Sequence, residues 1–204
     1  MKVLDLVNTP VSASKLEVIF NSASKNTALF ECVLLPQEEI KPHIHSFGED
    51  CAVVLSGELT YYVSNNQMIT ATAGDLVLGW QNVIHGYKNN TNNPLHLLIF
   101  ASPREFFISP TAIEYKYVAD DEPIVIHLPI EQRIIRSTQQ RVIESQYSSF
   151  STLQIEGVHQ REYNNEMQAF VDYKNKRVYI YEDEPVELPV KQATYFIKYE
   201  YSYK

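Results

Sequence analysis

The sequence predicts an all-β protein built as a sandwich or a barrel. Stretches rich in β-branched and aromatic residues recur roughly every eight to twelve residues, with turn residues between them. Five of the six glycines fall between Gly48 and Gly86, where the backbone therefore has to turn most tightly. The final stretch, Ala193–Lys204, alternates tyrosine-rich and polar positions, as expected for a strand with two different faces.

The composition is that of an ordinary globular protein, with 45% hydrophobic and 21% charged residues. The net charge of −8 and the lack of any run of Lys or Arg argue against nucleic acid as a partner. No segment approaches the roughly 20 apolar residues of a membrane span, and the first residues do not resemble a signal peptide. Only Cys32 and Cys51 are present, which favours reduced thiols. We therefore expect a cytoplasmic protein without a membrane or nucleic-acid partner.

The first elements precede Pro36. Lys15–Phe20 fits either a strand or a short helix, and the pattern does not decide between them. Thr27–Leu35 is a continuous β-rich run and predicts a buried strand.

The next elements form a hairpin and two further strands. Leu59–Val63 and Met68–Thr72 flank a short polar turn and predict a strand–turn–strand hairpin. Leu76–Leu78 begins a short strand. The polar turn Asn89–Pro94 leads into another strand at Leu95–Ala101.

Four residues in this region have the chemistry of a metal site. His43 and His45 are two apart in an extended segment, so their imidazoles point to the same side of a sheet. Asp50 follows after a short turn, and His85 lies 40 residues beyond His45. Three imidazoles and one carboxylate suit a divalent transition metal with coordination positions left open.

The spacing of these residues resembles the paired motifs of the cupin superfamily. The first motif has the form H-x-H, three or four residues, an acid, six residues and glycine. The second has the form G-x5-P-x-G-x2-H-x3-N. The positions that fit are His43, His45, Asp50, Gly57, Gly74, His85 and Asn89. The positions that depart are Gln37 and Asn82, where the family has glycine, and Trp80, where it has proline.

The resemblance covers roughly residues 26–107 and implies a jelly-roll barrel, also called a double-stranded β-helix. It implies one divalent transition metal, such as Fe, Mn, Ni, Zn or Cu, held by His43, His45, Asp50 and His85. Glu49 remains an alternative to Asp50, since it fits the three-residue spacing. Asp50 is preferred because its six-residue step to Gly57 keeps it on one face with Ala52 and Val54.

A pocket beside this metal should bind a small organic molecule. Apolar walls with phenol donors suit such a ligand. The residues expected to line the pocket, outside the ligand set, are Tyr61, Tyr62, Trp80, Tyr87 and His96.

The second half of the chain resembles the first at the level of strand pattern. A shift of 117 positions aligns Glu49–Gly79 with Glu166–Phe196, but the same shift replaces His43, His45, Asp50 and His85 with Gln160, Glu162, Met167 and Ser202. This predicts a bicupin whose second half is degenerate and has lost its metal. That half is too short to be complete unless the N-terminal segment completes it.

We therefore expect a metal-binding cupin barrel over residues 1–107 and a linker over 108–145. A degenerate cupin-like β region follows over 146–204. The linker should contain a short helix within Glu131–Glu144.

Two functions are open at this point, because the cupin fold hosts many reactions. The first is a metal-dependent enzyme of dioxygenase, decarboxylase, isomerase or lyase type, acting on a small oxygenated acid, keto compound or sugar derivative. The second is a non-catalytic binding or sensing module. The tyrosine face of the last strand packs either within the chain or in a homodimer interface, and a homodimer is expected.

Overall fold

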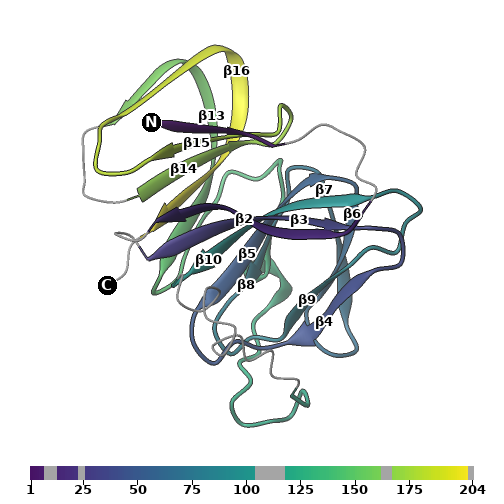
Figure 1. The fold of residues 1–204 in the computed structure, drawn as a ribbon. Helices are drawn as coiled ribbons and strands as arrows, with labels where there is room; N and C mark the ends of the chain where they lie inside the picture. The colour runs from purple at the N-terminus through teal and green to yellow at the C-terminus, as the bar shows by residue number, and fades with distance from the viewer. Residues whose placement is uncertain (7–12, 23–25, 104–117, 162–166, 202–204) are drawn as a thin grey trace. The chain divides into compact units, whose positions relative to one another are not determined.

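The computed structural model describes residues 1–6, 13–22, 26–103, 118–161 and 167–201 (Figure 1). The chain forms two compact units, which are described separately. One spans residues 10–137 and is called the barrel unit. The other combines residues 1–9 with residues 138–204 and is called the C-terminal unit. No helix in the described part of the chain is long and apolar enough to cross a membrane.

The barrel unit consists of two antiparallel sheets (Figure 1). Its six-stranded sheet has the order β11-β8-β5-β10-β3-β2, and its four-stranded sheet has the order β4-β9-β6-β7. The elements of this unit, in chain order, are β2 (Lys15–Ser22), β3 (Thr27–Leu34), β4 (Glu39–His43), β5 (Glu49–Ser56), β6 (Glu58–Tyr62), β7 (Met68–Thr72), β8 (Leu76–Gly79), β9 (His85–Lys88), β10 (Leu95–Ser102), the 3-10 helix η1 (Ile130–Gln132) and β11 (Ile134–Ile135).

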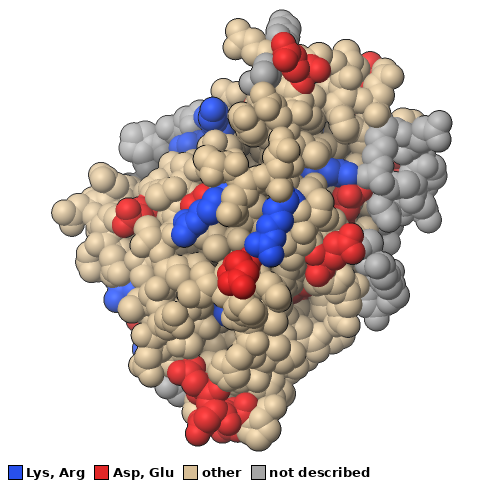
Figure 2. Space-filling view, turned by 180° about the vertical axis from the view of Figure 1, so that it is seen from behind, with Lys and Arg blue, Asp and Glu red and all other residues tan. Residues whose placement is uncertain are grey.

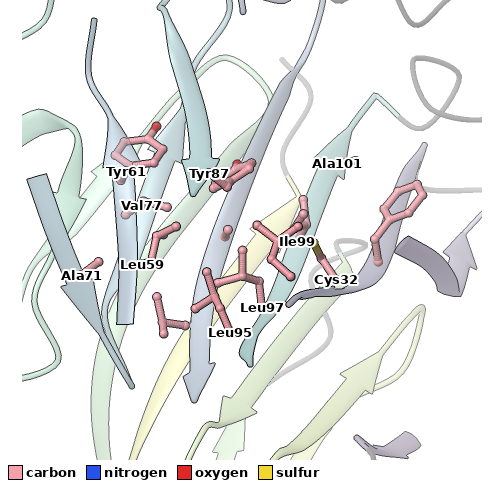
Figure 3. Packing of buried hydrophobic residues seen from close by; sticks show 14 of the residues in the cluster. Cys32, Leu59, Tyr61, Ala71, Val77, Tyr87, Leu95, Leu97, Ile99 and Ala101 are labelled. Carbon is pink, nitrogen blue, oxygen red and sulfur yellow. The ribbon is translucent and has the colours of Figure 1, made fainter. Parts of the chain in front are cut away.

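The core lies between the two sheets and follows the two-residue period of the strands. On β10, Leu95, Leu97 and Ile99 face inward, and their cross-strand partners on β3 are core residues as well. Leu59 and Tyr61 of β6 join the same cluster from the four-stranded sheet. Figure 3 shows these side chains packed between the strands, with Tyr61 and Tyr87 at the end of the cluster away from Leu95. The inner wall of the barrel is therefore apolar along most of its length.

The strands predicted within residues 59–101 are confirmed. β6 and β7 pair as the expected hairpin, from Glu58↔Thr72 to Tyr62↔Met68. Lys15–Phe20, for which the sequence left strand and helix open, belongs to strand β2. It pairs with β3 at the edge of the six-stranded sheet.

The helix expected within Glu131–Glu144 is wrong. Apart from the single turn η1, this stretch contains β11 and the short strand β12 (Val142–Glu144). Ile134 pairs with Val77 and Ile135 with Leu76, so β11 extends the six-stranded sheet beside β8. Pairing with an open sheet edge outweighs the weak helical pattern of the apolar residues here.

The boundaries of the units also differ from the expected ones. Residues 118–137, expected to be linker, belong to the barrel unit. Within them Val118 is buried and packs on Ile44 and Ile84, together with the partly buried Val125. The expected linker residues 108–117 lie outside the described residues.

The C-terminal unit contains one six-stranded antiparallel sheet of order β1-β15-β14-β16-β13-β12. Its strands, besides β12, are β1 (Lys2–Asp5), β13 (Ser148–Arg161), β14 (Met167–Asp172), β15 (Arg177–Tyr181) and β16 (Val186–Tyr201). The N-terminal strand β1 pairs with β15 from Lys2↔Ile180 to Asp5↔Arg177. The N-terminal segment, which the sequence placed with the first domain, thus adds an edge strand to this sheet.

The last strand, β16, buries residues on both of its faces. Tyr199 is buried and stacks on Phe150 at a ring-centroid distance of 5.1 Å, so this tyrosine packs within the chain. Phe196, on the face expected to be polar, belongs to a second apolar cluster with Phe170 and Leu188. The C-terminal end of this alternation, at residues 202–204, lies outside the described residues.

The predicted repeat agrees with the structure in strand position but not in strand pairing. A shift of 117 carries β5 onto β14 almost without offset. However, β5 pairs with β8 and β10, whereas β14 pairs with β15 and β16. A degenerate second cupin half therefore stays a prediction.

Leu97→Ala should destabilise the barrel unit by about 2–5 kcal/mol, because it empties a site at the centre of the core. The matched control is Leu16→Ala on the edge strand β2, where the side chain is 49% exposed and a change within about 0.5 kcal/mol is expected. Urea denaturation followed by tryptophan fluorescence measures both. Equal losses in the two variants would contradict the placement of the core.

Candidate metal centre

The four predicted ligand residues lie together at one end of the barrel. His43 ends β4 and pairs directly with His85, the first residue of β9. His45 is the second residue after the end of β4, and Asp50 is the second residue of β5. One ligand atom from each of the four lies within 4.8 Å of all the others, and all four residues are buried. The structure therefore brings together residues that are up to 42 positions apart in the sequence.

The distances within this cluster suit a single ion. His43 Nε2 lies 3.2 Å from His45 Nε2, and His45 Nε2 lies 3.5 Å from Asp50 Oδ2. Asp50 Oδ1 lies 2.9 Å from His85 Nε2. Two ligand atoms that each sit about 2.1 Å from one ion, at right angles to each other, are about 3 Å apart. No ligand atom has to move far to reach a shared centre.

Backbone carbonyls set the tautomer of two of the imidazoles. His43 Nδ1 lies 2.7 Å from the carbonyl oxygen of Lys41, and His85 Nδ1 lies 2.7 Å from that of Val83. Since a carbonyl can only accept, Nδ1 carries the proton in both rings. In the neutral form of each ring Nε2 therefore presents its lone pair to the cluster, as a metal ligand must.

His85 and Asp50 form the shortest contact of the cluster, with His85 Nε2 2.9 Å from Asp50 Oδ1 and both residues buried. A nitrogen atom and a carboxylate oxygen come this close only when a positive charge lies between them, and either a proton on His85 or a metal ion bound by both atoms supplies it. The residues present thus fit a bound divalent metal ion.

Burial and neighbouring charges keep the cluster in its metal-binding protonation state. Burial, with a smaller contribution from His85, lowers the pKa of His43 to about 3. Burial also lowers the pKa of His45, although Asp50 opposes it. Burial alone would raise the pKa of Asp50, but His85 and His45 outweigh it and hold that pKa well below its usual value. At neutral pH these two imidazoles are neutral and the carboxyl is ionised.

Asp50, and not Glu49, is the acid in the cluster. Asp50 pairs with Ala101 of β10, which is a core residue, so its side chain points into the barrel. Glu49 is the preceding residue on the same strand and therefore points to the opposite face. The shorter side chain of aspartate still reaches the cluster because β5 passes directly beside it.

Two neighbours hold the carboxylate of Asp50 in place. Tyr87 donates a hydrogen bond from its hydroxyl to Asp50 Oδ1 at 2.9 Å. Gly79 lies opposite Asp50 on β8, and a Cβ atom there would come within 2.4 Å of the Asp50 carbonyl oxygen and 2.5 Å of Oδ1. Only glycine leaves room for the carboxylate at this point of the sheet.

Of the residues expected to line the pocket, Tyr87 contacts Asp50, Tyr61 packs on Tyr87, and Trp80 contacts the segment that follows the barrel strands. Tyr61 donates to the carbonyl oxygen of Leu78 at 2.9 Å, and its ring lies 5.8 Å from that of Tyr87. Trp80 donates from Nε1 to the carbonyl oxygen of Gln132 at 3.1 Å. Trp80 thus holds the segment that follows the barrel strands.

Tyr62 and His96 do not point into the barrel, which corrects the expected pocket lining. Tyr62 follows the inward-facing Tyr61 and donates to Glu39 Oε2 at 3.0 Å, beside an open depression on the outer surface. His96 alternates with the core residues Leu95 and Leu97, and its Nε2 lies 2.7 Å from Glu31 Oε1. The two-residue strand period places both side chains on the other face of their sheets.

The departures from the two motifs have a physical explanation. Gln37 and Asn82, which replace glycines, both adopt positive φ, at 68° and 59°. The backbone therefore keeps the left-handed conformation that glycine adopts most easily. Asn82 also donates from its backbone N–H to the carbonyl oxygen of His45 at 2.8 Å, which joins the two motifs.

Arg133 is the residue near the cluster that the sequence did not single out. It is 1% exposed, and its guanidinium bonds to residues on both sides of the barrel end. In the sequence it stands between polar residues and an Ile-Ile pair, as many surface arginines do. Its role comes from the placement of residues 118–137 on the barrel, which no local pattern reveals.

Comparisons with known proteins agree with this fold. A family model described as a cupin domain matches residues 30–101. The comparison with curated proteins found no match.

Solved structures are similar to this chain at low sequence identity. Salicylate 1,2-dioxygenase from Pseudaminobacter salicylatoxidans has a TM-score of 0.65 and 12% identity over 92% of this chain and 76% of its own. AerE from Microcystis aeruginosa has a TM-score of 0.58 and 16% identity over 98% and 96%. An uncharacterized protein with a double-stranded β-helix domain from Klebsiella pneumoniae has a TM-score of 0.42 and 24% identity over 48% and 78%. At these identities the likeness concerns the fold.

The lowered pKa of His43 predicts how the stability of the metal-free protein depends on pH. Between about pH 6.5 and the folded-state pKa of about 3, the unfolded chain binds a proton at His43 that the folded chain does not bind. The free energy of unfolding should therefore fall on acidification, with His43 contributing about 1.4 kcal/mol per pH unit. Urea denaturation at a series of pH values in the presence of chelator measures this slope.

His43→Gln should reduce the slope by about one proton. His127→Gln, which replaces an exposed histidine, should leave it unchanged. An undiminished slope in His43→Gln would show that His43 is not a buried neutral imidazole.

Proposed function

Because residues 30–101 form a domain of the cupin superfamily, we propose that the barrel unit is a metal-dependent enzyme that acts on a small oxygenated organic molecule. His43, His45, Asp50 and His85 hold the metal. The observation that carries this proposal is the convergence of their four ligand atoms within 4.8 Å, together with the buried contact of 2.9 Å between His85 Nε2 and Asp50 Oδ1.

The donor set indicates the class of metal. Three neutral imidazoles and one carboxylate suit Fe, Mn, Co, Ni, Cu or Zn better than Mg or Ca, which prefer oxygen ligands. Such an ion acts as a Lewis acid and, if it is redox-active, can also bind dioxygen. The similarity in fold to salicylate 1,2-dioxygenase makes iron the first metal to test and dioxygen the first co-substrate.

The residues around the metal site shape a dry and weakly polar environment. Core residues of both sheets, such as Val54, Leu59 and Ile99, cover the wall of the barrel below the cluster. Burial raises the pKa of Tyr61 and of Tyr87, so both phenols stay protonated at neutral pH. They can donate hydrogen bonds but do not act as bases. This environment suits a small molecule whose oxygen atoms bind the metal and whose carbon skeleton contacts the apolar wall.

The same phenols support the second candidate, a binding or sensing module. Besides the metal ligands, the inward-facing titratable groups described near the cluster include Tyr61, Tyr87, Arg133 and Cys32. Burial raises the pKa of the two phenols and raises that of the Cys32 thiol to about 12, so none of these three is a base at neutral pH, and a guanidinium is always protonated. A site without a side-chain base can hold a ligand without turning it over. The enzyme is preferred because the metal itself supplies the reactive chemistry.

We propose a small molecule as partner and expect neither nucleic acid nor membrane. On the face shown in Figure 2, Lys and Arg side chains are scattered among Asp and Glu and form no continuous basic surface. This supports a role without phosphate-backbone binding. A cytoplasmic location and a homodimer belong to the same proposal.

The purified protein should contain about one transition-metal ion per chain after loading with Fe²⁺ under anaerobic conditions, as measured by elemental analysis. His85→Ala and Asp50→Asn should each lose most of this metal, because each removes a ligand. His96→Gln and Glu49→Gln are matched controls on the other face of the sheet and should retain it. Metal retained in His85→Ala, or lost equally in all four variants, would refute the site.

Turnover distinguishes the enzyme from the sensor. The metal-loaded protein should consume dioxygen or form product with at least one member of a panel of hydroxybenzoates, keto acids, oxalate and uronic sugars. His85→Ala should be inactive towards that compound. A compound that raises the melting temperature of the loaded protein without turnover would favour the sensing module.

A further inference from the structure

Arg133 is a buried cation whose hydrogen-bond partners, among the described residues, are carbonyl oxygens and a phenol hydroxyl. Its Nη2 donates to the carbonyl oxygen of Ile84 at 2.6 Å and to the hydroxyl of Tyr61 at 3.3 Å. Its Nη1 donates to the carbonyl oxygen of Val63 at 3.0 Å, and Nε to that of Leu78 at 3.4 Å. The structure shows no ion pair between Arg133 and a carboxylate among the described residues. One side chain thus bonds to three carbonyl oxygens and one hydroxyl at the end of the barrel where the candidate metal ligands lie.

These points belong to both sheets. Leu78 lies on β8 of the six-stranded sheet, while Tyr61 lies on β6 of the four-stranded sheet and Val63 directly follows that strand. Ile84 lies in the connection from β8 to β9 and immediately precedes His85. The planar guanidinium, with five N–H groups in fixed directions, can bond to all of them at once, which an ammonium group cannot do.

Three of the four groups, those of Ile84, Leu78 and Tyr61, lead to Asp50 or His85 directly or through one intervening residue. Ile84 neighbours His85, and Leu78 neighbours Gly79, on which the Asp50 carboxylate packs. Tyr61 packs on Tyr87, which in turn donates to Asp50. These contacts link the guanidinium to His85 and Asp50.

The backbone around Arg133 is held independently of its side chain. Leu78 donates from its N–H to the carbonyl oxygen of Arg133 at 3.0 Å, and Trp80 donates to that of Gln132. The pairs Ile134↔Val77 and Ile135↔Leu76 add a short strand. Since these contacts already attach the segment, the buried guanidinium is not needed to keep residues 130–135 in place. A buried arginine without a carboxylate partner is also a poor source of stability, and an apolar side chain of similar size often serves as well.

We infer that Arg133 is a positioning residue for the metal centre, which holds His85 and Asp50 in the geometry that binds the ion. This rests on the proposed metal site. It adds a residue from outside both motifs, 48 positions beyond the last ligand. The guanidinium bonds to Ile84, which precedes His85, and to Tyr61, which packs on Tyr87 beside Asp50. It thereby fixes the distance between these two parts of the barrel.

The test compares Arg133→Met and Arg133→Lys with Arg136→Met as a matched control. Arg136 lies in the same segment, but its side chain is 41% exposed and bonds to Asp75 at 2.9 Å. The dissociation constant for Co²⁺ is measured by competition with a chelator, and the visible absorption of bound Co²⁺ reports the ligand geometry. Arg133→Met should weaken binding about 10–100-fold and change the spectrum, as loss of an outer-shell partner does. Arg133→Lys should recover only part of the affinity, and Arg136→Met should match the wild type.

A second measurement uses the metal-free protein. The Nδ1–H protons of His43 and His85, which bond to backbone carbonyls, are followed by proton NMR with solvent exchange. In Arg133→Met the His85 proton should exchange several-fold faster, while the His43 proton should keep its wild-type rate. If Arg133→Met does not fold, Arg133→Lys is compared with the wild type in the same way.

The outcomes separate the two proposals. Wild-type Co²⁺ affinity with an unchanged spectrum in the folded Arg133 variants would overturn the positioning role and leave the metal site intact. A wild-type protein that binds no metal would instead refute the proposed function, and the exchange of the His85 proton would then decide the positioning role by itself. Equal acceleration at His43 and His85 would mean that Arg133 supports only the general stability of the barrel.

Discussion

The contact of 2.9 Å between Asp50 Oδ1 and His85 Nε2 is the interaction on which the site depends, because the two atoms come this close only with a positive charge between them. The folded chain holds this arrangement with the Val83 carbonyl, the Tyr87 hydroxyl and the open space beside Gly79. These partners fix both atoms in a position where they can share a cation. The energy for holding it comes from the barrel as a whole, since each partner lies on a strand of the common core.

The barrel supplies this rigidity through register. His43 faces His85 across the β4–β9 pair, and Asp50 faces Gly79 across the β5–β8 pair. A slip of one residue in either pair would turn a ligand to the opposite face of its sheet. The core residues on the same strands fix the register, because a slip of one residue would also turn them away from the core. Core packing and ligand placement are therefore the same constraint.

Residues 118–137, which follow strand β10, add side chains to the end of the barrel where the candidate metal ligands lie. Trp80, at the position where the family motif has proline, bonds to this segment, and Arg133 returns from it to four groups of the barrel. Chemistry at the site thus depends on residues from three parts of the chain, of which the family motifs include two. The fold alone does not choose a reaction, and the choice falls to the metal and to the ligand that the apolar wall admits.

The sequence by itself determined the fold class, most strand positions in residues 27–101 and the four residues of the cluster. Strand periodicity and motif spacing are local features of the sequence. They predict the structure correctly because each strand must keep its apolar face inward. Local spacing also preferred Asp50 over Glu49, and the two-residue strand period explains why that preference agrees with the cluster. The sequence could not show that Tyr62 and His96 point to the outer faces of their sheets, one position out of step with the core residues. It also could not show that the first strand joins the C-terminal sheet. It gave no sign of Arg133, because a buried arginine is recognised only by its surroundings, and its surroundings come from residues 49 to 72 positions away. Those long-range contacts exist only once the sheets have closed on each other, which is why the tertiary structure alone decided how the site is held.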